Sequence, residues 1–168
     1  TAGLVAAGVI AKKLIEPVRA EAELIEAGGS RDIEKAVDDA MRTKDSIGGI
    51  VACRVTGLPV GLGEPFFDSV ESLISHMVFS VPAVKGIEFG AGFGGSAMRG
   101  SDYNDVITGP DGRTATNNAG GINGGLTNGN DIVFRVAVRP TASIPRPQST
   151  IDLGSGEGAT LSVEGRHD

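Results

Sequence analysis

The sequence predicts an α+β fold with antiparallel or mixed sheets. Helix-like and strand-like segments alternate over residues 2–89, whereas strands and loops dominate the remainder, and no internal repeat is evident. A doubly wound parallel sheet would need helices to alternate with strands along the whole chain. The order of the segments therefore favours the α+β class.

The first segments show two clear periodicities. Residues 2–15 are apolar on most sides, which predicts a buried helix that ends before Pro17. Residues 18–24 alternate between apolar and charged side chains, which is typical of a half-exposed strand. Ser30 can cap the amphipathic helix that follows this strand.

The later segments change from helix to strands and loops. Asp68 and Glu71 resemble the start of a third helix with a capping box. Residues 90–130 are rich in Gly, Asn, Asp and Thr and show little periodicity, so we expect loops there. Residues 131–138 alternate as a strand does. Further strands are expected at residues 49–55, 84–89, 149–153 and 159–165.

Composition excludes several classes of function. The net charge of −6 and the absence of Trp argue against nucleic acid as a partner. No apolar run is long enough to span a bilayer and no signal peptide precedes the first helix, so we expect no membrane association. Cys53 is the single cysteine, which excludes an internal disulfide and favours a reducing compartment, with Cys53 as a small apolar residue in a strand.

Four segments rich in Gly, Asn and Pro predict one ligand-binding surface. Loops of this composition cost backbone entropy and give little packing, so they commonly bring the backbone close to a ligand. The longest of them offers three Asn side chains and four glycines. The segments are residues 57–65, 80–86, 116–125 and 139–143.

Residues 90–95 match G-x-G-x-x-G after a strand, a pattern that is typical of dinucleotide-binding loops. That fingerprint requires a helix to begin at its third glycine. Residues 96–105 have no apolar stripe and contain another glycine, so a nicotinamide oxidoreductase is the weaker alternative. His76 has no second His or Cys at metal-ligand spacing, and we expect no metal site.

Residues 139–143 leave a strand and present a guanidinium, two hydroxyls and backbone amides in succession. Such a set can hold an anionic or polar cofactor. A strand-exit turn would also contain Pro and Ser, so the two interpretations stay open on these residues alone.

Taken in order, several segments resemble chorismate synthases over nearly the whole chain. Residues 2–14 are similar to the helix that follows the Arg-Ser-Ser-Ala-Arg signature of that family. The resemblance implies a β-α-β sandwich of mixed α+β type that assembles as a homotetramer. The other matching segments are residues 45–49, 57–65, 81–86, 117–125 and 165–168.

The resemblance also implies an activity. Chorismate synthases carry out the 1,4-anti elimination of phosphate from 5-enolpyruvylshikimate-3-phosphate, which gives chorismate, and they require reduced FMN although no net redox change occurs. The enzyme would be a carbon–oxygen lyase of aromatic amino-acid biosynthesis, in the shikimate pathway, in the cytoplasm or a plastid.

Family positions can be carried over to this sequence residue by residue. Asp168 matches the carboxylate near the flavin N5, where it would act as general base. Two positions depart from the family pattern, since Pro82 stands where Asn is frequent and Arg139 where Lys is common. The implied flavin contacts are Pro82, Ala83, Gly124, Arg139, Pro140, Thr141, Ala142, Ser143 and Arg166.

Parts of the family pattern have no match here. The Gly-Glu-Ser-His segment, a second His and the arginines that hold the substrate are absent, and the Arg-His-Asp motif stops before its Pro-Cys continuation. We therefore expect residues 1–168 to form a single, incomplete domain that is inactive in isolation. The alternative is a non-catalytic module that binds FMN or oligomerises.

Overall fold

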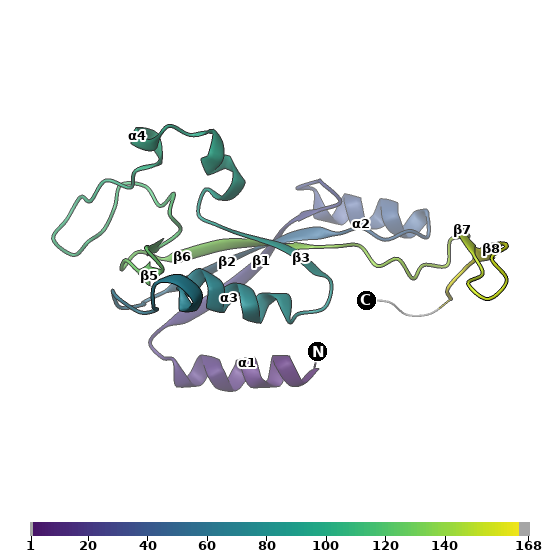
Figure 1. Ribbon diagram of the computed structural model, residues 1–168, viewed down its shortest axis with the longest axis horizontal. Coiled ribbons are helices and arrows are strands. Elements are labelled where there is room, and N and C mark those ends of the chain that lie inside the picture. The colour runs from purple at the N-terminus through teal and green to yellow at the C-terminus, as the bar shows by residue number, and fades with distance from the viewer. Residues whose placement is uncertain (1, 165–168) are drawn as a thin grey trace.

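The computed structural model describes residues 2–164, and an antiparallel sheet forms their centre (Figure 1). The strand order is β1-β2-β6-β3, and every neighbouring pair is antiparallel. Together with the helices, this arrangement confirms the predicted α+β class. The strands are β1 (Arg19–Ala27), β2 (Gly49–Thr56), β3 (Val84–Phe89) and β6 (Ile132–Val138).

Strand β6 lies inside the sheet, between β2 and β3, and runs from one end of the sheet to the other. Its first residue, Ile132, pairs with Val55 near the end of β2, and its last, Val138, pairs with Gly49 at the start of β2. Ile132 and Val136 are buried whereas Arg135 is exposed, as the alternating sequence predicts. Segments that contact the first residues of β6 therefore lie at the opposite end of the sheet from segments that contact its last residues.

Helix α3 (Val70–Phe79) covers one face of the sheet. Its first residue packs against Ile122 and Ile132 in the buried cluster, and the rings of Phe89 and Phe134 extend the cluster with centroids 5.6 Å apart. Complete burial of an aliphatic side chain such as Ile132 contributes about 1.5–3 kcal/mol to folding. The core consequently lies under the beginning of α3, near the start of β6.

Helix α1 (Ala2–Leu14) forms where the sequence predicts it, but the expected burial is wrong. None of its residues is buried, and it lies apart from the sheet in Figure 1. An apolar sequence predicts that a helix can be buried, whereas burial itself needs a neighbouring element. No element among residues 2–164 covers this helix.

Two helix starts differ from the prediction by one or two residues. Helix α2 (Ile33–Arg42) is capped by Asp32, whose carboxylate accepts a hydrogen bond from the Lys35 amide at 3.2 Å. Ser30 instead accepts from the Asp32 amide in the preceding turn. Helix α3 is capped by Ser69, whose hydroxyl accepts from the Ser72 amide at 3.1 Å, and not by Asp68. Several capping residues stand side by side here, and sequence spacing does not distinguish them.

The remaining elements are short. Residues 90–130 contain little regular structure, as expected, and the last two strands are shorter than predicted and form a separate hairpin at one edge of the molecule (Figure 1). Within residues 2–164, no helix is both long and apolar enough to cross a membrane. The short elements are two 3-10 helices (Phe66–Asp68 and Gly92–Ala97), α4 (Gly100–Tyr103), β4 (Ile122–Asn123), β5 (Leu126–Thr127), β7 (Gln148–Ile151) and β8 (Gly158–Leu161).

Candidate functional site

The four loops that we expected to form one surface fall into two clusters. Residues 57–65 and 116–125 meet near the start of β6, and residues 80–86 and 139–143 meet at its end. Seven extended residues separate the clusters, which corresponds to about 20 Å. The prediction of a single surface is therefore wrong within this chain, because the central strand holds the two pairs apart.

The cluster at the start of β6, called here the glycine end, is held by a buried threonine. The Thr127 hydroxyl donates to the Pro59 carbonyl at 2.6 Å and accepts from the Leu62 amide at 2.9 Å. The Val70 amide at the start of α3 donates to the Gly125 carbonyl at 3.0 Å. Loop, hairpin and helix are thus joined through backbone groups.

Glycines at this end serve close packing of the backbone. A Cβ on Gly121, which has φ of +83°, would lie 2.5 Å from the Asp131 carbonyl oxygen. That separation leaves no room for a side chain. Gly124 differs, since it is exposed and no atom lies within 4 Å of its virtual Cβ. Its role as a flavin contact stays a prediction.

Asp105 anchors the glycine end, and the sequence analysis did not identify it. Its carboxylate accepts hydrogen bonds from the Thr116 hydroxyl at 2.6 Å and from the amides of Asn118 and Ala119 at 2.7 and 2.8 Å. Burial raises the pKa of Asp105, but these three donors outweigh it and hold the pKa below its ordinary value. Sequence offered only a weak signal, an Asp in a polar loop.

The cluster at the end of β6 contains most of the predicted flavin contacts. Residues 139–143, called here the strap, continue directly from β6. The Arg139 amide donates to the Ala83 carbonyl at 2.9 Å, so the strap lies against Ala83 and the adjoining Pro82. Ala83 has φ of +70°, an uncommon conformation for a residue with a Cβ. Pro82, Ala83 and the strap are thus together, whereas Gly124 is at the other end.

Among residues 2–164, the donors of the strap have no acidic partner. Arg139 forms no ion pair with any residue from 2 to 164, and one of its nitrogens donates only to the Pro140 carbonyl at 2.9 Å. Within the same part of the chain, the amides of Thr141 and Ala142 have no hydrogen-bond acceptor. The nearby Asp45 is paired with Arg146 at 2.8 Å. This donor set fits a phosphate or another anionic group.

Two predicted site residues belong to the last four positions of the chain. They are Arg166 and Asp168, and both lie outside the described residues. Their implied roles as flavin contact and general base remain predictions.

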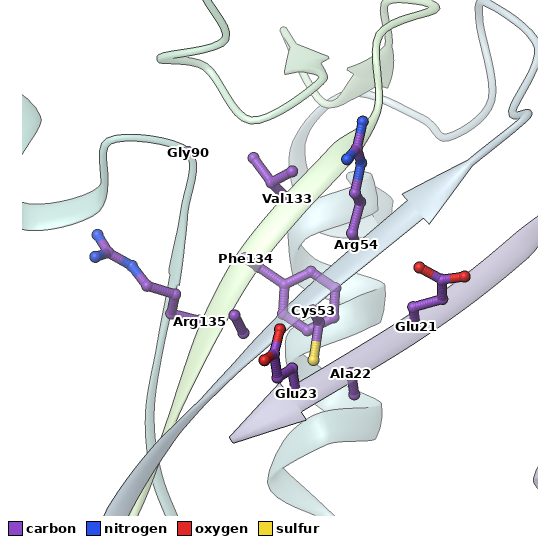
Figure 2. Close-up of a pocket in the computed structure, with 10 residues that line it drawn as sticks. Glu21, Ala22, Glu23, Cys53, Arg54, Gly90, Val133, Phe134 and Arg135 are labelled. Carbon is purple, nitrogen blue, oxygen red and sulfur yellow. The ribbon is translucent and has the colours of Figure 1, made fainter. Parts of the chain in front are cut away.

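A hollow of about 680 Å³ lies over β1, β2 and β6 and contains none of the predicted site residues (Figure 2). Glu21 and Arg54 stand opposite each other on the neighbouring strands β1 and β2. Arg54 forms an ion pair with Asp131, and Arg135 forms one with Glu88 at 2.8 Å. Because these guanidiniums already have carboxylate partners, the hollow is less suited to an anionic ligand than the strap.

Cys53 on β2 lines this hollow. Burial raises the pKa of the Cys53 thiol, which agrees with its predicted place as a small apolar residue in a strand.

The Phe93 amide, inside G-x-G-x-x-G, donates to the Glu88 carboxylate at 2.9 Å. A carboxylate of the chain thus takes the amide that a pyrophosphate would need, which argues against a dinucleotide site.

The described residues give no support for a metal site. Across residues 2–164, no three His, Cys, Asp or Glu side chains are grouped so that they could hold a metal ion. His76 lies exposed in the last turn of α3.

Comparison with known proteins decides the family. The family model described as chorismate synthase matches residues 1–168. The chain belongs to the chorismate synthase family. The chorismate synthase of Chitinophaga pinensis is 59% identical over 169 residues, which cover 100% of this chain and 51% of that protein. Membership confirms the resemblance found in the sequence.

Other members of the chorismate synthase family agree. The chorismate synthase of Opitutus terrae is 50% identical over 126 residues, 74% of this chain and 34% of that protein. That of Methanosarcina mazei is 41% identical over 199 residues, 100% of this chain and 54% of that protein. The chain spans about half or less of the length of these relatives.

The fold is also that of a solved family member. A crystal structure of chorismate synthase superposes with a TM-score of 0.76 at 24% identity and covers 83% of this chain and 55% of that one. This similarity confirms the expected fold, with helices packed on antiparallel sheet.

Proposed function

We propose that this chain is the central-to-late part of a chorismate synthase, and that residues 1–168 contribute to a single domain. The whole enzyme would eliminate phosphate from 5-enolpyruvylshikimate-3-phosphate to give chorismate. The observation that carries the proposal is the strap, at which the family pattern implies flavin contacts. Among residues 2–164, its guanidinium has no acidic partner and its amides at Thr141 and Ala142 have no acceptor.

The residues of the strap would hold reduced FMN. Arg139 would bind an anionic part of the cofactor, while the amides of Thr141 and Ala142 donate to its polar atoms. Pro82 and Ala83 would form the adjacent wall. When bound, reduced FMN supplies electron density as the C–O bond of the substrate breaks. Asp168 would manage the proton at the flavin N5.

The departures from the family pattern affect binding more than chemistry. Arg139 keeps the positive charge of the family's Lys but spreads it over a planar group, which can donate two parallel hydrogen bonds to one anion. Pro82 removes the side-chain amide of the family's Asn. The strap would therefore depend more on Arg139 for polar contact than a typical member does.

Residues 1–168 alone would turn over little substrate. The net charge of −6 disfavours two anionic ligands unless arginines outside these residues reverse the local field. The complete enzyme would be a cytoplasmic homotetramer that binds a small-molecule substrate and no nucleic acid or membrane. These properties rest on the family.

The test is turnover by the intact protein that contains these residues. With reduced FMN and 5-enolpyruvylshikimate-3-phosphate under anaerobic conditions, we expect chorismate and inorganic phosphate in equal amounts. Oxidised FMN alone should give neither product. Flavin binding without phosphate release would contradict the proposal and favour a non-catalytic module, and near-normal turnover by residues 1–168 alone would contradict their expected inactivity.

A further inference from the structure

A short segment before β2 lies under the strap. The Ser46 hydroxyl donates to the Thr141 carbonyl at 2.5 Å in a partly buried position. The two residues are 95 positions apart in the sequence, so the bond joins distant parts of the chain. Residues 45–48 are called here the support segment.

Gly48 lets the support segment approach the strap closely. A Cβ on Gly48 would lie 2.5 Å from the Val138 carbonyl oxygen and 3.0 Å from Cδ of Pro140. Its φ is not in the left-handed region, so the backbone itself would accept alanine. Glycine is therefore needed at this position for space, and any side chain would push the strap outward.

The support segment is fixed on its other side. The Gly28 amide donates to the Gly48 carbonyl at 2.8 Å, which ties the segment to the turn after β1. Beyond the strap, Asp45 pairs with Arg146 at 2.8 Å, although both side chains are largely exposed. The Gln148 side-chain amide also donates to the Ala142 carbonyl at 2.9 Å. The strap is thus held from both its ends.

We infer that Ser46 and Gly48 are positioning residues for the ligand of the strap. The Ser46 hydroxyl donates to the Thr141 carbonyl and so orients the peptide group between Thr141 and Ala142. In a trans peptide the N–H points opposite to the C=O, so the Ala142 amide faces away from Ser46. Because Gly48 has no side chain, Pro140 can pack directly against the support segment. Donors held in place before binding lose less entropy when the ligand arrives. This inference rests on the proposed function, because it assigns FMN as the ligand.

The test uses two readouts on the full chain. Hydrogen–deuterium exchange of the Arg139 amide, which donates to the Ala83 carbonyl at 2.9 Å, reports without flavin how firmly the strap is held. Titration with FMN, followed by flavin fluorescence, gives the dissociation constant. The variants are Ser46→Ala, which removes the donor, Ser46→Thr, which retains it, and Gly48→Ala, which fills the contact.

Matched controls exist elsewhere in the chain. Ser96→Ala removes a hydroxyl that donates to the Phe93 carbonyl at 2.7 Å, the same kind of bond in a remote turn. Gly158→Ala adds a Cβ where no atom lies within 4 Å and where φ is not in the left-handed region. Both controls should leave strap exchange and FMN affinity unchanged.

We expect Ser46→Ala to accelerate exchange in the strap and to weaken FMN binding about fivefold, the effect of one lost hydrogen bond. Ser46→Thr should bind within about twofold of the wild type, and Gly48→Ala should lose about tenfold or more. Unchanged strap exchange in Ser46→Ala and Gly48→Ala would overturn the inference. Faster exchange with unchanged FMN affinity would overturn it as well.

The exchange readout separates this inference from the proposed function. If the wild-type chain binds no FMN in the titration, the assignment of flavin to the strap is contradicted. The exchange results would still show whether Ser46 and Gly48 hold the strap, since they are measured without ligand.

Discussion

The two ends of β6 use similar residue types for opposite purposes. At the glycine end, Gly121 and Gly125 are buried and bring backbone against backbone, and Thr127 satisfies the groups that meet there. At the strap end, the Arg139 guanidinium has no acidic partner among the described residues, and the amides of Thr141 and Ala142 have no acceptor there. A glycine-rich loop therefore does not by itself indicate a ligand, whereas unpaired donors held in a fixed strap do.

Stability should respond most strongly at the glycine end. Ile132 is 2% exposed and belongs to the cluster with Val70 and Ile122. We expect Ile132→Ala to lower the free energy of unfolding by about 2–5 kcal/mol, because it leaves a cavity in the core. Chemical denaturation measures the change.

The matched control for this change lies beyond the strap. Ile151 is 58% exposed in β7, so Ile151→Ala should change the free energy of unfolding by roughly 0.5 kcal/mol or less. Similar losses in the two variants would contradict the division into a packed end and an open end.

A smaller effect is expected at Asp105. In Asp105→Asn one acceptor becomes a donor that faces the amide of Asn118 or Ala119, which should cost roughly 1–2 kcal/mol of unfolding free energy. Because the pKa is lowered in the folded state, the contribution of Asp105 is present above its ordinary value of 3.8 and is lost as the pH falls below it.

Denaturation as a function of pH checks this prediction. The difference between wild type and Asp105→Asn should shrink as the pH falls below 3.8. Asp152→Asn is the control, since Asp152 accepts from the amides of Gly154 and Ser155 in an exposed turn. It should destabilise the protein less than Asp105→Asn, and an equal or larger effect would count against Asp105 as the anchor.

Much of the fold could be predicted from the sequence. The alternation in residues 131–138 gave β6 within one residue, and residues 84–89 gave β3 without error. Periodicity is a property of the local sequence, so it predicts a strand without knowledge of the elements that pack against it. The predicted caps of α2 and α3 differ from the observed ones by one or two positions, because nearby Ser and Asp residues can all cap a helix.

What the sequence could not predict depends on tertiary contacts. The burial of α1 requires an element that covers it, and its composition shows only that it could be covered. The separation of Gly124 from the strap follows from the length of β6 between them. Ser46 was part of a recognised segment, but its bond to Thr141 became visible only in the structure.

The central claim is that the strap end, and not the glycine end, holds the anionic part of the flavin. The most direct measurement is FMN affinity in Arg139→Ala and Arg54→Ala, which remove a guanidinium at each end of β6. We expect a loss of about tenfold or more in Arg139→Ala, as for a hydrogen bond to a charged group, and a change within about twofold in Arg54→Ala, whose guanidinium is already paired with Asp131. Equal losses, or a larger loss in Arg54→Ala, would contradict the account.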